Sequence, residues 1–125
     1  MNFKKLNIDP TCSIDSDGNK FWFNKNNKYH RKNGPATEYA NGGKEWYING
    51  QRHHEDGPAI EYSNGLKEWW LNNKRHRKDG PAVEWLDRYK EWWINGKYYP
   101  TEKEYWLKIY EMKLITKKEL FLKLL

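Results

Sequence analysis

The stretch KRHRKDGPAVEW at residues 74–85 decides the fold, because two close copies precede it, KYHRKNGPATEY at 28–39 and QRHHEDGPAIEY at 51–62. A fixed period of about 20 to 50 residues is typical of a solenoid, whose units are each too small to bury their own apolar face. Three landmarks keep a 23-residue spacing: His30, His53 and His76; the Gly-Pro-Ala corners starting at 34, 57 and 80; and the Lys-Glu-Trp runs starting at 44, 67 and 90.

Each unit reads as a β-hairpin. In PAIEYSNGLKEWWL (58–71), two short runs rich in β-branched and aromatic residues flank Asn64-Gly65, a pair that tolerates the positive φ of a two-residue turn. Gly80-Pro81 then ends the strand pairing, where the missing amide of proline does least harm. The sequence therefore predicts a mainly β fold, a meander of stacked antiparallel hairpins.

The turn sets the register of the middle hairpin. A two-residue turn puts Glu61 opposite Glu68 and leaves Ile60 facing Trp69 on an apolar face. A three-residue loop would pair Glu61 with Lys67 but would turn Glu68 into the apolar side, so we favour the two-residue turn. It predicts an apolar face of Thr37, Tyr39, Trp46, Ile48, Ile60, Tyr62, Trp69, Val83, Trp85, Trp92 and Ile94, and an opposite face with alanines, glutamates, Tyr47, Trp70 and Trp93.

The ends of the array depart from the repeat. We divide the chain into an N-terminal segment (1–16), a repeat array (17–100) and a C-terminal helical cap (101–125). One extra residue between Gly18 and His30 predicts a bulge or a slipped register. Asp87-Arg88 replaces Asn-Gly in the last hairpin, so a primed turn is not expected there.

The cap reads as two short helices. Thr101 precedes Glu104 by three residues and Thr116 precedes Glu119 by three, which are two capping-box patterns. We expect the helices to cover an apolar sheet face or the open last strand. Their apolar stripes would be Tyr105, Trp106, Ile109 and Tyr110 in the first, and Leu120, Phe121 and Leu124 in the second.

Composition narrows the class of protein. A chain of 125 residues is long enough for one domain, and its 17% aromatic residues compensate for an apolar content of only 37%. The net charge of +6 would attract phosphates or an acidic protein surface. A single cysteine, Cys12, and the lack of a leader or a long apolar run lead us to expect a cytoplasmic protein.

The runs YINGQRH (47–53), WLNNKRH (70–76) and WINGKYY (93–99) resemble the aromatic-x-x-Gly-x-x-His core of MORN (membrane occupation and recognition nexus) repeats over roughly residues 17–99. Asn73 departs from the family's glycine, and a longer HRKDGPA replaces its Gly-x-Gly continuation. The HRxDGPA spelling is similar to repeats of phage and large-virus proteins. The resemblance implies an elongated scaffold that binds protein, with lipid binding proposed for some members and an antitoxin-like label for some bacterial ones.

Neither a metal site nor catalysis is expected. Equivalent histidines two strands apart lie about 10 Å from each other, whereas the ligands of one zinc ion lie within about 4 Å of each other. The paired carboxylates recur in every unit, so no pair has the special environment that acid and base catalysis needs. The three pairs of carboxylates are Glu38 with Glu45, Glu61 with Glu68, and Glu84 with Glu91. We therefore expect that the protein uses no cofactor and is not an enzyme.

An array of this kind mainly binds, and two surfaces are candidates. We favour the first surface, which would bind a protein partner, such as a host factor that a viral protein modulates. It consists of Tyr47, Trp70 and Trp93, ringed by Glu45, Glu68 and Glu91. The alternative is a basic loop edge for nucleic acid or nucleotide, made by Arg31, Arg52, Lys74, Arg75, Arg77 and Lys78. Lipid headgroups would use the same cations and are disfavoured, and self-association through a free sheet edge stays open.

Overall fold

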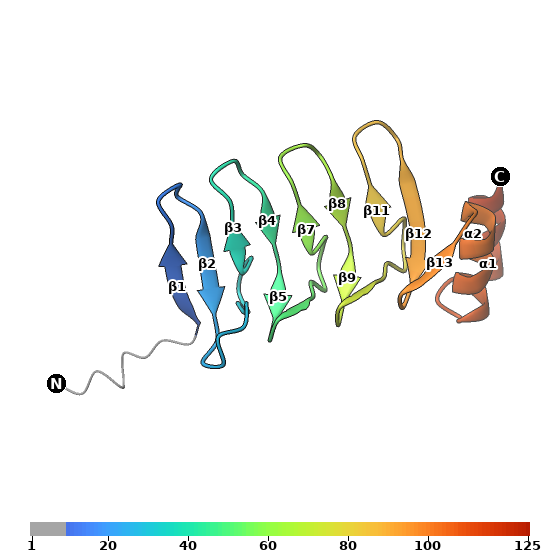
Figure 1. The fold of residues 1–125 in the computed structure, drawn as a ribbon. Coiled ribbons are helices and arrows are strands. Elements are labelled where there is room, and N and C mark those ends of the chain that lie inside the picture. The colour runs from blue at the N-terminus through green and yellow to red at the C-terminus, as the bar shows by residue number, and fades with distance from the viewer. Residues whose placement is uncertain (1–9) are drawn as a thin grey trace.

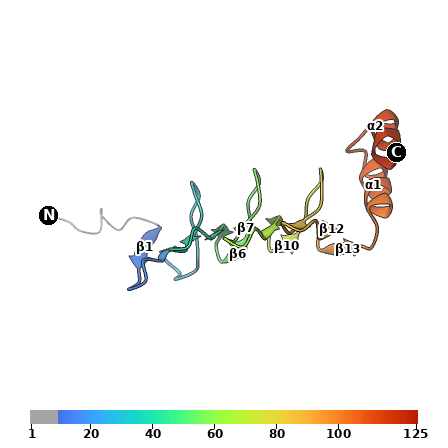
Figure 2. The same cartoon turned by 90° about the horizontal axis from the view of Figure 1, so that it is seen from above.

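The computed structural model describes residues 10–125 and confirms a β meander with a helical cap (Figure 1). Seen from above, the sheet is a single layer, and the helices stand at its C-terminal end (Figure 2). One antiparallel sheet has the order β1 (Thr11–Ile14), β2 (Lys20–Phe23), β3 (Thr37–Glu38), β4 (Lys44–Glu45), β7 (Ile60–Glu61), β8 (Lys67–Glu68), β11 (Val83–Glu84), β12 (Lys90–Ile94) and β13 (Lys97–Tyr99).

Two further hairpins continue β4 and β8 beyond one-residue breaks at Trp46 and Trp69. They are β5 (Tyr47–Ile48) with β6 (Gln51–Arg52), and β9 (Trp70–Leu71) with β10 (Lys74–Arg75). The sheet begins at Thr11, earlier than the predicted start of the array at residue 17, because β1 pairs with β2. Residues 1–9 of the predicted N-terminal segment lie outside the described part of the chain.

The preferred register of the hairpins is wrong, and the three-residue alternative is confirmed. Glu61 pairs with Lys67, and Ile60 pairs with Glu68. The loop closes through two bonds, from Tyr62 N to Leu66 O at 3.0 Å and from Gly65 N to Tyr62 O at 2.9 Å. Gly65 has a φ of +92°, so a glycine in the third loop position relieves the strain of a left-handed residue.

The same three-residue loop recurs at each hairpin tip. Its third residue has a positive φ in all four tips: Gly18, Gly42, Gly65 and Arg88. Arg88, with a φ of 79°, is the one non-glycine residue of this set. The loss of Asn-Gly in the last hairpin therefore leaves the turn unchanged and places the strain on Arg88.

Primed two-residue turns occur instead at the opposite end of the strands. Asn49-Gly50, Asn72-Asn73 and Asn95-Gly96 each have positive φ at both positions, as a type I′ turn requires. In the first unit, the extra residue lengthens this turn: Asn24 and Lys28 close a three-residue loop. The predicted slip of register is therefore wrong, since the ladder from β2 to β3 pairs Phe21 with Thr37 as the later units do.

The corrected register gives each sheet face a row of its own. On one face, lysine and glutamate alternate across consecutive strands, so every cross-strand neighbour carries the opposite charge, which stabilises the sheet. We call this side the charge-ladder face; its row is Lys20, Glu38, Lys44, Glu61, Lys67, Glu84 and Lys90. The other face carries Phe21, Thr37, Glu45, Ile60, Glu68, Val83 and Glu91.

The register also moves the tryptophans. Side chains two residues apart share a face of a strand, so Trp46 lies with Lys44 and Tyr47 lies with Glu45. The prediction that Trp46, Trp69 and Trp92 share an apolar face with Tyr39, Tyr62 and Trp85 is therefore wrong. Instead, Tyr47, Trp70 and Trp93 lie on the same face as those residues.

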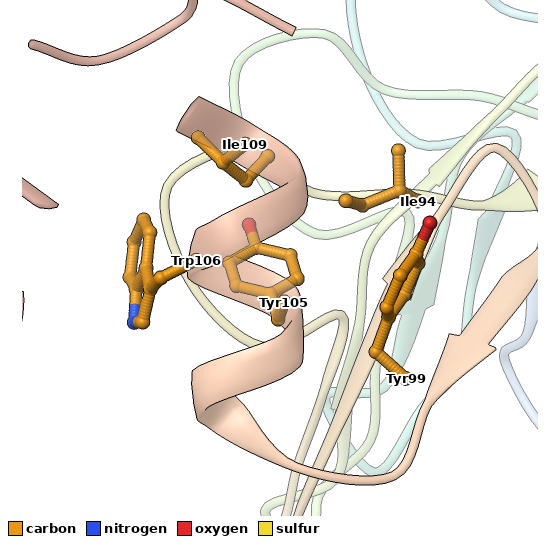
Figure 3. Packing of buried hydrophobic residues seen from close by; sticks show 5 residues of the cluster. All are labelled: Ile94, Tyr99, Tyr105, Trp106 and Ile109. Atoms are coloured by element: carbon orange, nitrogen blue, oxygen red, sulfur yellow. The ribbon is translucent and has the colours of Figure 1, made fainter. Parts of the chain in front are cut away.

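The cap covers the last strands. Helix α1 (Glu102–Glu111) packs on the last strands, and its Tyr105, Trp106 and Ile109 form with Ile94 and Tyr99 the one buried cluster among residues 10–125 (Figure 3). Its N-cap Thr101 accepts a bond from Glu104 N, which is one of the two bonds of the predicted capping box.

Helix α2 (Lys117–Leu124) begins with a complete capping box between Thr116 and Glu119. It packs mainly through Leu120, whereas Phe121 is 65% exposed. Tyr110 and Leu124 are also exposed, so three residues of the predicted stripes do not cover the sheet.

We predict that Arg88→Gly stabilises the protein by about 0.5–1 kcal/mol. Relief of a left-handed L-residue gains about 1–2 kcal/mol, and the extra freedom of glycine in the unfolded chain offsets about 0.4–1 kcal/mol. Urea unfolding followed by circular dichroism measures the change, with Arg88→Lys as a neutral control. A destabilised Arg88→Gly would contradict this interpretation of the tip.

Candidate functional site

Rings and guanidinium groups alternate along one sheet face. The Arg52 Cζ atom lies 5.9 Å from the Tyr47 ring centroid and 5.1 Å from that of Trp70. The Arg75 Cζ atom lies 5.0 Å from the centroids of both Trp70 and Trp93. Each guanidinium therefore sits between two rings at cation–π distance. We call this side of the sheet the aromatic–arginine face.

Tyrosines extend the row at both ends. The Tyr29 ring lies 5.3 Å from Tyr47, and the Tyr98 ring lies 5.3 Å from Trp93. The sequence interpretation placed Ala36, Ala59 and Ala82 on this face, which would leave slots between the rings. Those alanines are fully buried on the other face, and the 23-residue column Tyr29, Arg52, Arg75 and Tyr98 fills the slots instead. Periodicity alone could have revealed this column.

The predicted glutamates lie beneath the rings. Trp70 Nε1 donates to Glu68 Oε2 at 3.1 Å, and Trp93 Nε1 donates to Glu91 Oε1 at 2.8 Å. Arg75 completes the middle site with a 3.0 Å bond to Glu68 Oε1. Glu68 is only 8% exposed, so it anchors the ring and the guanidinium from below rather than forming a polar rim at the surface.

Glu45 is anchored by hydroxyl groups. It is 5% exposed, and it accepts bonds from Tyr39 Oη at 2.7 Å, Tyr62 Oη at 2.8 Å and Thr37 Oγ1 at 3.3 Å. Burial, and then the bond to Glu45, raise the pKa of Tyr39 to about 12. The same two causes raise the pKa of Tyr62 well above its usual value. Both phenols therefore remain donors at neutral pH and satisfy the buried carboxylate. The sequence interpretation missed these partners because its register placed the tyrosines on the other face.

A hollow of about 340 Å³ opens between two neighbouring rings of the row. Its walls are Trp70 and Trp93, and Arg75 and Lys74 supply cationic groups. Asn73, Asn95 and Gly96 of the tight turns complete the lining. The aromatic–arginine face is thus a ridged surface with a depression between Trp70 and Trp93 rather than a flat sheet.

The charge-ladder face is covered by residues of the loops that connect the units. The Arg31 Cζ atom lies 3.9 Å above the Trp22 ring, and the Arg77 Cζ atom lies 3.8 Å above Trp69. His54 takes the same place in the middle unit, where its ring stacks on Trp46 at 4.6 Å and an angle of 6°.

These covering residues also explain the Gly-Pro-Ala corner. Arg77 Nη1 donates to Pro81 O at 3.0 Å, and the equivalent bonds of Arg31 and His54 reach Pro35 and Pro58. A Cβ atom on Gly80 would lie only 2.8 Å from Arg77 Cζ, so glycine leaves room for the guanidinium.

The six cations of the predicted basic edge do not lie on one edge. Arg31 and Arg77 cover the charge-ladder face and pair with Glu38 and Glu84, at 3.1 and 2.9 Å. Arg77 also bonds Asp79. Arg52 and Arg75 lie on the aromatic–arginine face, and Arg75 pairs with Glu68. Lys74 and Lys78 remain exposed at separate sites.

The three histidines bind backbone rather than each other. The Nδ1 atoms of His30, His53 and His76 each accept a 3.0 Å bond from the amide of the turn asparagine 19 residues later, at Asn49, Asn72 and Asn95. Among residues 10–125, no three His, Cys, Asp or Glu side chains are placed to hold a metal ion. The recurring glutamate pairs are divided between the two faces, since Glu38 pairs with Lys44 and Glu45 with Thr37.

Comparison with protein-family models, curated proteins and solved structures finds no match to this chain. Membership of the MORN-repeat family therefore stays a prediction. In the described part of the chain, neither helix has the length and apolar character needed to cross a bilayer.

We predict that His76 makes stability depend on pH. Burial, and then Lys78, lower the pKa of His76, and protonation at Nδ1 would break the bond from Asn95. As the pH falls, His76 is therefore protonated in the unfolded state before it is protonated in the folded state. The free energy of unfolding should stay level above about pH 7 and fall as the pH drops below about 6.5, towards the lowered pKa of the folded protein. Urea unfolding of the wild type and His76→Asn measures this, and an unchanged pH dependence in the variant would contradict it.

We predict that Arg75→Met destabilises the protein by about 1–3 kcal/mol more than Arg52→Met. Both arginines touch two rings, but Arg75 also neutralises Glu68, whereas Arg52 forms no ion pair among residues 10–125. Met keeps the aliphatic volume, so the difference in the free energy of unfolding reports the cost of leaving the buried Glu68 carboxylate without its cation. Equal losses in urea unfolding would show that the Glu68 pair contributes nothing.

Proposed function

We propose that this protein is a non-enzymatic scaffold that binds a protein partner through the aromatic–arginine face. The observation that carries this proposal is the unbroken row of Tyr47, Arg52, Trp70, Arg75 and Trp93. Tryptophan, tyrosine and arginine are the residues that most often dominate the energy of protein–protein interfaces.

The row is also held in place before any partner arrives. Trp70 and Trp93 are each bonded to a glutamate, and Arg75 is held between two rings and a carboxylate. Fixed side chains lose little rotamer freedom on binding, so more of the contact energy remains as affinity. Half-buried rings also present an edge that a partner can cover completely.

The predicted alternative, nucleic-acid binding, draws less support from the geometry. Phosphate recognition needs several free cations along one groove. Here Arg31, Arg75 and Arg77 are each paired with a carboxylate, and the cations are divided between two faces. A viral origin, a host factor as partner and a cytoplasmic location stay predictions.

Tryptophans on opposite faces allow a matched test. We expect Trp70→Ala to abolish capture of a partner from extract of a candidate host cell, because it removes the central ring. Trp22→Ala should retain capture, because Trp22 lies under Arg31 on the charge-ladder face. Immobilised proteins and quantitative mass spectrometry make the comparison, with circular dichroism to verify that both variants are folded.

Two further arms separate the classes of partner. Capture that survives nuclease and about 0.5 M salt indicates a protein, whereas capture lost in either treatment indicates phosphate contacts. Equal loss in both tryptophan variants, with both still folded, would overturn the assignment to the aromatic–arginine face.

A further inference from the structure

The loops that connect the units carry charges whose sign alternates from one unit to the next. The first loop has Arg31, Lys32 and Asn33, the second has His54, Glu55 and Asp56, and the third has Arg77, Lys78 and Asp79. These triplets occupy equivalent positions of the 23-residue period. The surface therefore reads basic, acidic and basic in the direction of the array.

Ion pairs within the protein do not cancel this alternation of charge between the loops. Asp79 is bonded to Arg77, which also pairs with Glu84, so Lys78 is the cation left over in the third loop. Among residues 10–125, Lys32, Asp56 and Lys78 have no ion pair. Glu55 lies 3.6 Å from His53 Nε2 and is 77% exposed.

The middle unit is also the one that lacks the covering cation. His54 replaces arginine over Trp46, so Glu61 has no guanidinium partner corresponding to those of Glu38 and Glu84. The acidic character of the middle unit therefore extends from its loop into the charge ladder.

Two hollows separate the three loops. One, of about 490 Å³, lies between the first and second loops and has Trp46 and Ile48 in its lining. The other, of about 670 Å³, lies between the second and third loops and has Trp69 and Leu71 in its lining. Charged walls and apolar rings thus alternate along one continuous surface on the charge-ladder side.

The spacing of the loops fits an extended polypeptide. Equivalent positions of consecutive units are separated by two strand spacings, about 10 Å. One turn of a polyproline II helix has three residues, rises about 9 Å and returns a side chain to the same side, so the segment binds in this extended conformation. A uniform polyanion would meet Glu55 and Asp56 in the middle of its path. A polypeptide can carry both signs of charge and apolar side chains between them.

We propose that these loops form a second binding surface, for an extended polypeptide segment whose charges run acidic, basic, acidic at three-residue intervals. Its acidic residues lie at Lys32 and Lys78, its basic residue lies at Glu55 and Asp56, and its intervening apolar side chains enter the two hollows. The segment crosses the units at right angles to the strands. This surface is separate from the aromatic–arginine face.

The test uses the full chain and three synthetic peptides: Asp-Leu-Ser-Lys-Leu-Ser-Asp, its charge-reversed form Lys-Leu-Ser-Asp-Leu-Ser-Lys, and the all-acidic Asp-Leu-Ser-Asp-Leu-Ser-Asp. Amide chemical shifts, followed by NMR at about 50 mM salt where charge contacts are weakly screened, give both the location and the Kd. We expect the first peptide to bind with a Kd roughly ten-fold lower than the reversed one, with shifts at Lys32, Glu55 and Lys78.

A double substitution should switch the preference. In Glu55→Lys with Asp56→Lys, we expect the all-acidic peptide to bind best. The matched control, Asp17→Lys with Asp87→Lys, makes the same change in charge at exposed hairpin tips and should keep the original order. Trp70→Ala should leave the peptide Kd unchanged, so this surface and the proposed partner-binding face fail independently.

Equal affinity for the first two peptides, or shifts that avoid the three loops, would overturn the proposal. Tighter binding of an oligo-dT strand than of any peptide would also overturn it, since it would identify the surface as a phosphate site.

Discussion

Among residues 10–125 the sheet forms a single layer, so its own side chains must cover most of both faces, and the other main features of this protein follow from that constraint. On the charge-ladder face, Arg31, His54 and Arg77 lie over tryptophan rings. Tyr105 of the cap continues the series at the end of the array, with its ring 4.8 Å from Trp92. Its hydroxyl donates to Arg77 O, so the cap is joined to the last loop as well. Stacking therefore supplies the burial that a packed second sheet would otherwise provide.

The units are joined by the same bonds at each junction. Trp46 N donates to Ala59 O, His54 N donates to Trp70 O, and Asn73 N donates to Arg52 O. The histidine Nδ1 atom of one unit accepts a hydrogen bond from a backbone amide in the turn of the next unit. This bond requires that Nδ1 carry no proton. Because the period is 23 residues, each of these backbone donors lies opposite its acceptor in the next or preceding unit. The hydrogen bonds between units consequently set the spacing of the side chains on both candidate binding surfaces, before any contact with a partner.

Much of the fold could be predicted from the sequence, and the register could not. The period, the hairpins and both N-caps depend on local residue patterns. The choice between the two turns depended on whether Glu68 would be buried, and glutamate is almost never fully buried unless it is paired. Glu45 is buried because two tyrosines and a threonine satisfy it, and Glu68 because an arginine and a tryptophan do. Such partners become visible only after the register is known. The six residues of the predicted partner surface nevertheless came together, since Tyr47, Trp70, Trp93 and their glutamates lie two residues apart in either register.

The two ends of the array are unequal, and this gives the molecule a direction. Helix α1 buries Tyr99 and Ile94 at the C-terminal end, whereas every residue of β1 is exposed at the other. In a stack stabilised by nearest neighbours, opening begins where a unit packs on one neighbour and its own residues are exposed. Fraying should therefore start at β1 and proceed strand by strand, with amide protection rising toward α1. A chain built in this way can tolerate nicks or loss of its first hairpin while the remaining units stay folded.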